Sequence, residues 1–107
     1  MNKENNEIHQ IVWQGISITV RHNPNWGHGY KEIQGFCMTH TEIIRDDRKQ
    51  LPMTNTGYRS HFMDEREFEY YDDVIDFVIQ WLDHDAQSKA WKVYVADQNQ
   101  LKLVDFE

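Results

Sequence analysis

Between residues 8 and 22, apolar side chains recur at every second position on either side of the dipeptide Gln14-Gly15. Because strand side chains point alternately to the two faces of a sheet, this spacing predicts two half-buried strands. Gln14-Gly15 supplies a tight turn between them. We therefore predict a β-hairpin over residues 8–22, whose apolar positions are Ile11, Trp13, Ile16, Ile18 and Val20.

Two more extended segments are expected. Residues 31–44 carry apolar side chains on both faces, as a central strand partly covered on both sides does, and Gly35 within it marks a bulge or a close approach of another element. Residues 51–63 form the fourth segment, in which Pro52 is expected at a strand start or edge because proline has no N–H to donate. The run Asn55-Thr56-Gly57 predicts a chain reversal, with a positive φ at Gly57.

The segment of residues 23–30 contains one proline, two glycines and two asparagines and predicts a loop. Trp26 in this loop is interpreted as a plug at the edge of the core, since buried aromatic side chains contribute strongly to stability. Gly27-His28-Gly29 is too short for a phosphate-binding glycine loop and has no strand-to-helix context. A nucleotide-binding function is not expected.

The clearest helix is predicted over residues 68–83, with Asp72 or Asp73 near its start, where a carboxylate complements the helix dipole. Its buried side chains are expected to be Val74, Val78, Trp81 and Leu82 or Ile75. Residues 88–106 fit two structures. Ser88 could cap a second helix, while the alternation of Trp91, Val93 and Val95 equally permits a hairpin.

Together these patterns predict an α+β fold: an antiparallel sheet of about four strands from residues 8 to 63, followed by one or two C-terminal helices packed on one face. A chain of 107 residues is long enough for one domain and too short for two. We assign residues 1–7 to a flexible tail, because they are polar and aperiodic, and residues 8–107 to the domain.

The single cysteine, Cys37, excludes an intrachain disulfide and Cys-x-x-Cys metal sites. The first ten residues lack the apolar core of a signal peptide, and the sequence has no apolar run of about eighteen residues that would span a membrane. A cytoplasmic location is therefore expected.

The net charge of −7 is concentrated in residues 64–85, which contain nine acidic residues and one basic residue, Arg66, and so carry a charge of −8. The other nine acidic and ten basic residues sum to +1. Direct nucleic-acid binding by this segment is disfavoured, since phosphates need Lys and Arg. A basic partner protein is expected instead. The candidate binding residues are Asp64, Glu65, Glu67, Glu69, Asp72, Asp73 and Asp76.

An alternative site surrounds Gly57. Strand alternation places Arg59 and His61 on one face, where a guanidinium and an imidazole could bind an anion or act as an acid–base pair. The plainer interpretation is a strand whose Arg and His pair with neighbouring acids, and it is favoured. The alternative pocket comprises Trp26, Tyr58, Arg59 and His61.

Other chemistries are not expected. The six histidines have no i, i+4 pair, so zinc would have to be held by distant strands. Ser60 and His61 are adjacent in a strand and point to opposite faces, which excludes a serine nucleophile with that base. Asp72, Asp73 and Asp76 would need an apolar pocket to act as a general acid and base. We predict no catalytic residues, metal or cofactor.

The segments Trp13-Gln14-Gly15-Ile16, Asn23-Pro24-Asn25-Trp26, TNTGYRSHF (54–62) and FVIQWLD (77–83) resemble a family of small uncharacterised bacterial proteins, often encoded among phage and plasmid genes. The resemblance spans residues 11–91 and favours a helix over a hairpin at residues 88–106. It implies a mobile-element context and no established activity. The closing residues 100–106 also weakly resemble a bacterial sliding-clamp-binding peptide.

Two functions follow as hypotheses. In the first, the protein is a non-enzymatic binding or inhibitory protein of a mobile element, an anti-restriction or anti-CRISPR type of DNA mimic, acting through its acidic segment on a basic nucleic-acid-processing host protein. In the second, it is a small enzyme or ligand-binding module that uses the Arg59–His61 site near Gly57. The sequence indicates neither the partner nor the oligomeric state.

Overall fold

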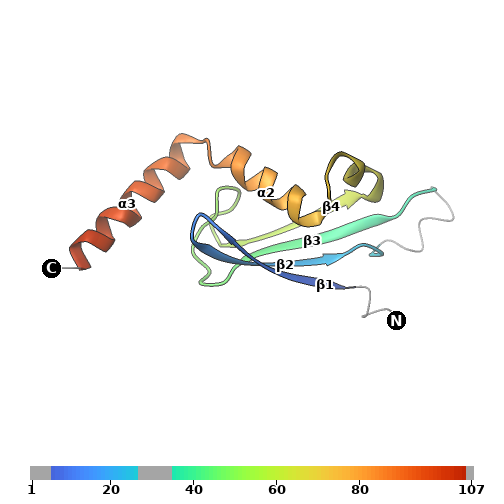
Figure 1. Ribbon diagram of the computed structural model, residues 1–107, viewed down its shortest axis with the longest axis horizontal. Coiled ribbons are helices and arrows are strands. Elements are labelled where there is room, and N and C mark those ends of the chain that lie inside the picture. The colour runs from blue at the N-terminus through green and yellow to red at the C-terminus, as the bar shows by residue number, and fades with distance from the viewer. Residues whose placement is uncertain (1–5, 27–34, 106–107) are drawn as a thin grey trace.

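The computed structural model describes residues 6–26 and 35–105 and consists of an antiparallel sheet followed by helices (Figure 1). The strands pair in the order β1-β2-β3-β4, each antiparallel to its neighbour: β1 is Glu7–Trp13, β2 is Ile16–Asn23, β3 is Met38–Arg45 and β4 is Tyr58–Asp64. The helical elements are η3, a 3-10 helix at Glu65–Tyr70, then α2 at Val74–Asp85 and α3 at Lys89–Asp105. The predicted α+β architecture is confirmed.

The β1–β2 hairpin forms as predicted, with Trp13 paired to Ile16 across the turn. Gln14 and Gly15 have φ angles of 50° and 76°, and two consecutive positive φ values give a turn whose twist matches that of the flanking strands. Glu7 already pairs in β1, so the strand includes the last residue of the expected tail; residues 1–5 of that tail lie outside the described residues.

The predicted strand over residues 31–44 is wrong at residues 35–37, because Gly35 and Phe36 form a bend and β3 begins at Met38. Residues 31–34 of that prediction lie outside the described residues. Gly35 has a φ of 81°, which leaves the extended region. The N–H of Cys37 donates to the carboxylate of Glu65 at 2.8 Å, not to a neighbouring strand.

Pro52 was expected at a strand start or edge, but it does not begin a strand. It lies in a tight turn that Leu51 and Thr54 close with two backbone hydrogen bonds of 2.9 and 3.1 Å. Proline suits this position because its fixed φ favours the turn and its missing N–H is not needed there. The strand itself starts six residues later, at Tyr58.

The single helix expected over residues 68–83 is divided in two. The 3-10 helix η3 ends at Tyr70, and Tyr71 and Asp73 have extended backbones before α2 begins at Val74. Asp73 is the N-cap of α2, since its carboxylate accepts the N–H of Asp76 at 2.8 Å. The predicted position of aspartate at the helix start is confirmed, and the helix boundary is corrected.

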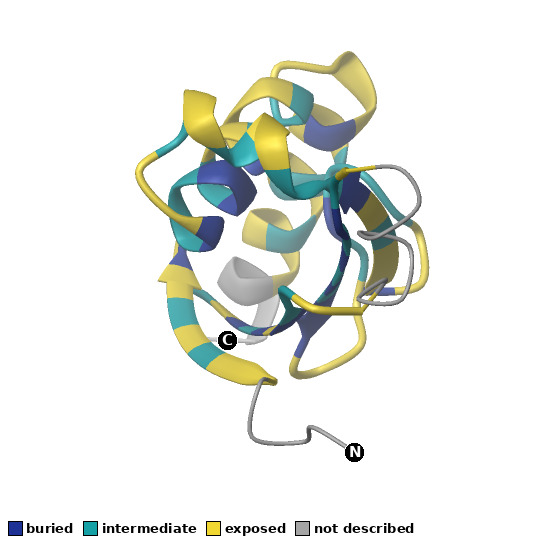
Figure 2. Cartoon of the chain, turned by 90° about the vertical axis from the view of Figure 1, so that its right-hand side faces the viewer, coloured by how far each residue is buried: buried dark blue, intermediate teal, exposed yellow. Residues whose placement is uncertain are grey.

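The core lies between one face of the sheet and α2 (Figure 2). From α2 it contains Val74, Phe77, Val78 and Leu82, whereas Ile75 and Trp81 are half-buried. The sheet and its connections contribute Trp13, Ile18, Val20, Ile43, Leu51 and Met63. No described helix packs on the other face of the sheet, which we call the open face (Figure 1).

Residues 89–105 form the helix α3, which confirms the helical alternative over the hairpin. Ser88 caps it, accepting the N–H of Trp91 at 3.1 Å. Trp91 is buried against Trp13, with ring centroids 5.8 Å apart, but α3 then runs beyond the end of the sheet (Figure 1). Phe106 of the clamp-like peptide lies outside the described residues.

The described helices include none with the length and apolar character needed for a membrane span.

Candidate functional site

The turn at Gly57 is rigidly held. Gly57 has the predicted positive φ, 74°, and its carbonyl accepts the N–H of Arg45 at 2.8 Å. The hydroxyls of Thr54 and Thr56 both donate to the carbonyl of Tyr58, at 3.0 and 3.3 Å. The TNTG part of the sequence therefore fixes the point at which β4 enters the sheet.

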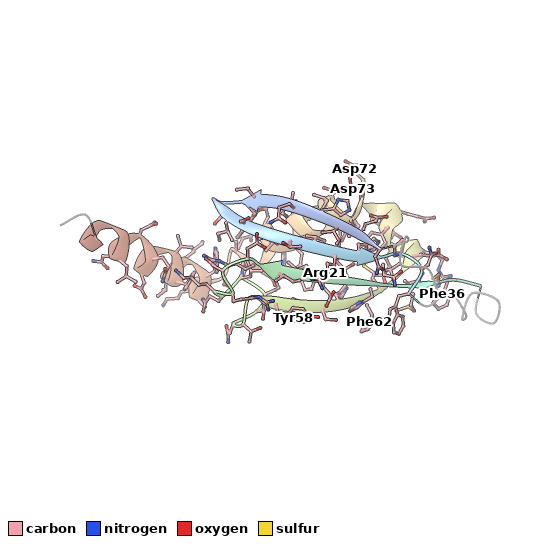
Figure 3. All side chains as sticks on the ribbon, turned by 90° about the horizontal axis from the view of Figure 1, so that it is seen from below. Arg21, Phe36, Tyr58, Phe62, Asp72 and Asp73 are labelled. Carbon is pink, nitrogen blue, oxygen red and sulfur yellow. The ribbon has the colours of Figure 1, made fainter. Side chains whose placement is uncertain are left out.

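The four residues of the alternative pocket are not brought together. Along β4, His61 pairs with Thr41 and Arg59 with Ile43, positions whose side chains face α2, whereas Tyr58, Ser60 and Phe62 project from the open face. Figure 3 shows the open face, with Tyr58 and Phe62 along β4. The sequence had predicted this alternation, and it separates Tyr58 from Arg59 and His61.

Trp26 is not a core plug, because 48% of it is exposed. It lies on the open face, where its ring centroid is 4.6 Å from that of Phe62 and 6.4 Å from that of His40. Phe62 and His40 stack on each other at 4.5 Å. These three rings form an aromatic cluster at one end of the open face.

Arg59 and His61 both pack against α2. The guanidinium of Arg59 lies 5.3 Å from the ring centroid of Trp81 and donates to the carbonyl of Met53 at 3.3 Å. The His61 ring stacks on Phe77 at 5.7 Å and meets Trp81 edge-on at 4.9 Å. Burial, and then the charge of Arg59, lower the pKa of His61, against a smaller opposing effect of Glu67. The imidazole is therefore neutral at pH 7.

An open cleft of about 370 Å³ adjoins this contact, lined by His61, Tyr71, Phe77, Gln80, Trp81 and His84. Its floor is aromatic, while an amide and two imidazoles supply polar groups. Sequence reasoning found only His61 as a site residue. The available signal was the i, i+3, i+4, i+7 spacing of Phe77, Gln80, Trp81 and His84, which places them on one face of a helix.

The acidic segment is largely occupied with local structure. Asp64 caps η3 and binds the guanidinium of Arg66, Glu65 holds the N–H of Cys37, and Asp73 caps α2. The carboxylate of Asp76 accepts from the N–H of Asp72 at 3.0 Å and from Gln80 at 3.1 Å. These contacts account for four of the seven candidate binding residues.

Two further carboxylates hold indole rings. Asp83 accepts the N–H of Trp13 at 2.8 Å, and Asp85 accepts that of Trp81 at 3.1 Å. The end of α2 is thereby tied to β1, and the indole of Trp81 is held against α2 itself.

Three candidate residues remain outward-facing: Glu67, Glu69 and Asp72 are exposed, and the described residues offer their carboxylates no hydrogen bond or ion pair within 4 Å. Tyr70, which lies between Glu69 and Asp72 in the sequence, has 83% of its surface exposed. We call these four residues the acidic surface. An arrangement of Asp72, Asp73 and Asp76 for acid–base chemistry is not formed, because Asp73 and Asp76 hold backbone N–H groups and Asp72 and Asp73 are open to solvent.

The described residues contain no group of three or more His, Cys, Asp or Glu side chains arranged to hold a metal ion. Cys37 is buried, and its thiol lies 3.6 Å from the carbonyl of Pro24. His28 lies outside the described residues.

The four sequence segments that carry the family resemblance, at residues 13–16, 23–26, 54–62 and 77–83, contact one another in the fold. Trp13 binds Asp83 of FVIQWLD, His61 of TNTGYRSHF stacks on Phe77, and Trp26 packs on Phe62. These residues therefore join the hairpin, β4 and α2 into one unit.

The family model of the KlcB third domain matches residues 6–91 of the chain. No curated protein and no solved structure matches the chain.

Proposed function

The chain belongs to the KlcB third-domain family, and from this premise we propose that it is a non-enzymatic protein-binding domain of a plasmid-associated protein. The observation that carries the proposal is the acidic surface: three outward-facing carboxylates and an exposed tyrosine within residues 67–72. Tyrosine is enriched at protein interfaces because it combines a large apolar ring with a polar end. Carboxylates beside it select a basic partner.

The remaining carboxylates of residues 64–85 assist without contacting the partner. A hydrogen-bonded carboxylate keeps its charge, and the guanidinium of Arg66 lowers the pKa of Asp64, which stays ionised at neutral pH. Charges that are not in contact still attract an oppositely charged protein over about 8 Å at physiological salt. We therefore assign steering to the whole segment and direct contact to Glu67, Glu69, Tyr70 and Asp72.

The finer proposal is that the partner is a nucleic-acid-processing host protein, and that binding inhibits it in the manner of an anti-restriction or anti-CRISPR protein. Proteins that hold nucleic acid place Lys and Arg against phosphates. Surface carboxylates can bind the same Lys and Arg side chains in place of phosphates, whereas they repel nucleic acid itself. A host protein with an exposed basic groove is the partner class that fits this charge.

The test is capture of host proteins from a bacterial lysate, followed by binding kinetics with the captured protein. The triple variant Glu67→Lys, Glu69→Lys, Asp72→Lys is expected to slow association at least tenfold and to reduce its dependence on salt. Glu65 is kept, because its carboxylate holds the N–H of Cys37. Reversal of Asp97, an exposed acid on α3, is a control for a charge reversal outside the acidic surface and should have little effect.

A second function is favoured by the aromatic cleft, namely small-ligand binding beside the Arg59–His61 site. Clefts that combine an apolar floor with a few polar groups are typical ligand sites. The same kinetic experiment tests which surface binds the partner. If the triple reversal leaves partner binding unchanged and His61→Ala abolishes it, the acidic surface is refuted and the partner binds at the cleft; small-ligand binding is supported if a ligand screen by tryptophan fluorescence gives a signal that His61→Ala removes.

A further inference from the structure

The open face of the sheet carries large exposed apolar side chains at both of its edges. Five large exposed hydrophobic side chains lie on it: Ile8 (69%), Val12 (74%), Trp26 (48%), Tyr58 (36%) and Phe62 (46%). Antiparallel sheets often leave one face in water, but that face is then mostly polar. The two aliphatic side chains stand on β1, at one edge of the sheet. The aromatic rings lie at the other edge: Tyr58 and Phe62 on β4 (Figure 3), and Trp26 beside Phe62.

The middle of the open face carries a pair of opposite charges. Arg21 on β2 and Glu42 on β3 are directly paired in the strand register, and their side chains are 3.9 Å apart. Glu42 also accepts the hydroxyl hydrogen of Tyr58. The row across the sheet therefore reads Ile8, Arg21, Glu42, Ser60.

We propose that the open face binds a second copy of this chain, face to face, about a two-fold axis that runs parallel to the strands between β2 and β3. That rotation exchanges β2 with β3 and β1 with β4. Arg21 then faces the partner's Glu42, and Glu42 faces the partner's Arg21. Ile8 falls over the partner's Ser60, between the partner's Tyr58 and the partner's Phe62, so the aliphatic edge of each copy meets the aromatic edge of the other.

Charge selects this axis over the alternative. The alternative two-fold axis runs perpendicular to the strands, along the row that contains Arg21 and Glu42. It would place β2 of one copy over β2 of the other, so that Arg21 would face the partner's Arg21, a like-charge contact that opposes association. The proposed axis also leaves η3 and α2 on the outer sides of the pair, because they cover the opposite face of the sheet. The two segments of charge −8 then point away from each other.

The available area predicts a dimer that dissociates on dilution. Four strands about 4.8 Å apart, each with about seven residues of about 3.4 Å, give a face of roughly 450 Å² in projection. Side chains enlarge the accessible area of such a face, yet stable complexes usually bury about 800 Å² on each partner. The acidic surface remains exposed in the dimer, so this inference does not depend on the proposed function.

Sedimentation equilibrium over a range of protein concentrations tests the proposal. The wild-type chain should pass from 12.9 kDa to twice that mass as its concentration rises. Arg21→Glu and Glu42→Arg should each weaken the dimer at least tenfold, since each sets like charges against each other across the axis. The double variant that carries both substitutions restores opposite charges and should recover the wild-type affinity within about threefold.

Lys92→Glu, on the exposed side of α3, makes the same change in net charge as Arg21→Glu and should leave the dimer intact. Phe62→Ser should weaken the dimer, while Val93→Ser, at a residue with similar exposure on α3, should not. A chain that stays monomeric at the highest concentration, or a double variant as weak as the single ones, overturns the proposal.

Discussion

Replacement of Gly57 by alanine tests whether the turn before β4 is fixed by backbone conformation and by close packing together. A Cβ at this position would lie 2.4 Å from the carbonyl oxygen of Lys49 and 2.9 Å from the carbonyl carbon of Arg48. An ordinary C···O contact is about 3.3 Å, so the facing backbone would have to move by roughly 0.9 Å. Arg48 itself has a positive φ, 62°, which leaves that segment little freedom to adapt.

The expected loss of stability has two parts. A left-handed conformation costs a residue with a Cβ about 1–2 kcal/mol, and overpacking against a fixed neighbour costs about 1–3 kcal/mol. Loss of glycine's freedom in the unfolded chain returns about 0.4–1 kcal/mol. We therefore expect Gly57→Ala to lower the free energy of unfolding by roughly 2–4 kcal/mol, a large part of the about 5–15 kcal/mol typical of a domain.

Gly15→Ala is the matched control. Gly15 also has a positive φ, 76°, but a Cβ there would meet no atom within 4 Å. It therefore bears only the conformational cost, a net loss of about 1 kcal/mol. Urea unfolding followed by tryptophan fluorescence gives both free energies, provided that the dependence on urea concentration is unchanged. Equal losses for the two variants would refute the close packing at Gly57.

The remaining predictions concern α2, His22 and His61. Asp73→Ala should cost about 1 kcal/mol because it removes the N-cap of α2, whereas Glu69→Ala, at an exposed position, should be within about 0.5 kcal/mol of wild type in the same unfolding assay. Trp81→Ala should cost roughly 2–4 kcal/mol, somewhat less than a fully buried tryptophan; a loss below about 1 kcal/mol would contradict the packing of Arg59 and His61 on this ring. Burial lowers the pKa values of His22 and His61 from 6.5, so the unfolded chain binds protons at a higher pH than the folded chain does. The contribution of these histidines to the free energy of unfolding is therefore complete above about pH 6.5 and should fall as the pH drops towards their folded-state pKa values. His61→Phe keeps a ring against α2 and should reduce that fall; an unchanged pH profile would show that His61 does not titrate as described.

Local patterns were sufficient for much of the fold. The alternation in residues 8–22 and 58–63 specified the strands and the side of β4 on which each side chain lies, and Gly57 specified its turn, because these features depend on backbone geometry within a few residues. The aspartate at the start of α2 was predictable for the same reason. These are the features that the structure confirms.

The site residues were harder to predict because their roles depend on distant partners. Nothing near Glu65 in the sequence indicates that it holds Cys37, 28 residues away, and nothing near Asp83 indicates Trp13, 70 residues away. The run of acids was therefore taken as one charged surface, although most of its carboxylates have structural partners. Trp26 was assigned to the core for its size alone, while its actual neighbours come from β3 and β4.

The projection of α3 changes how this protein behaves as a hydrodynamic particle. The molecule measures 61 × 26 × 22 Å with a radius of gyration of 16.5 Å, compared with about 13 Å for a globular chain of this length. An elongated particle diffuses more slowly than a sphere of equal mass, so a monomer will leave a gel-filtration column early and resemble a dimer. Shortening α3 after Tyr94 should bring the elution volume towards that of a globular standard without any change in association.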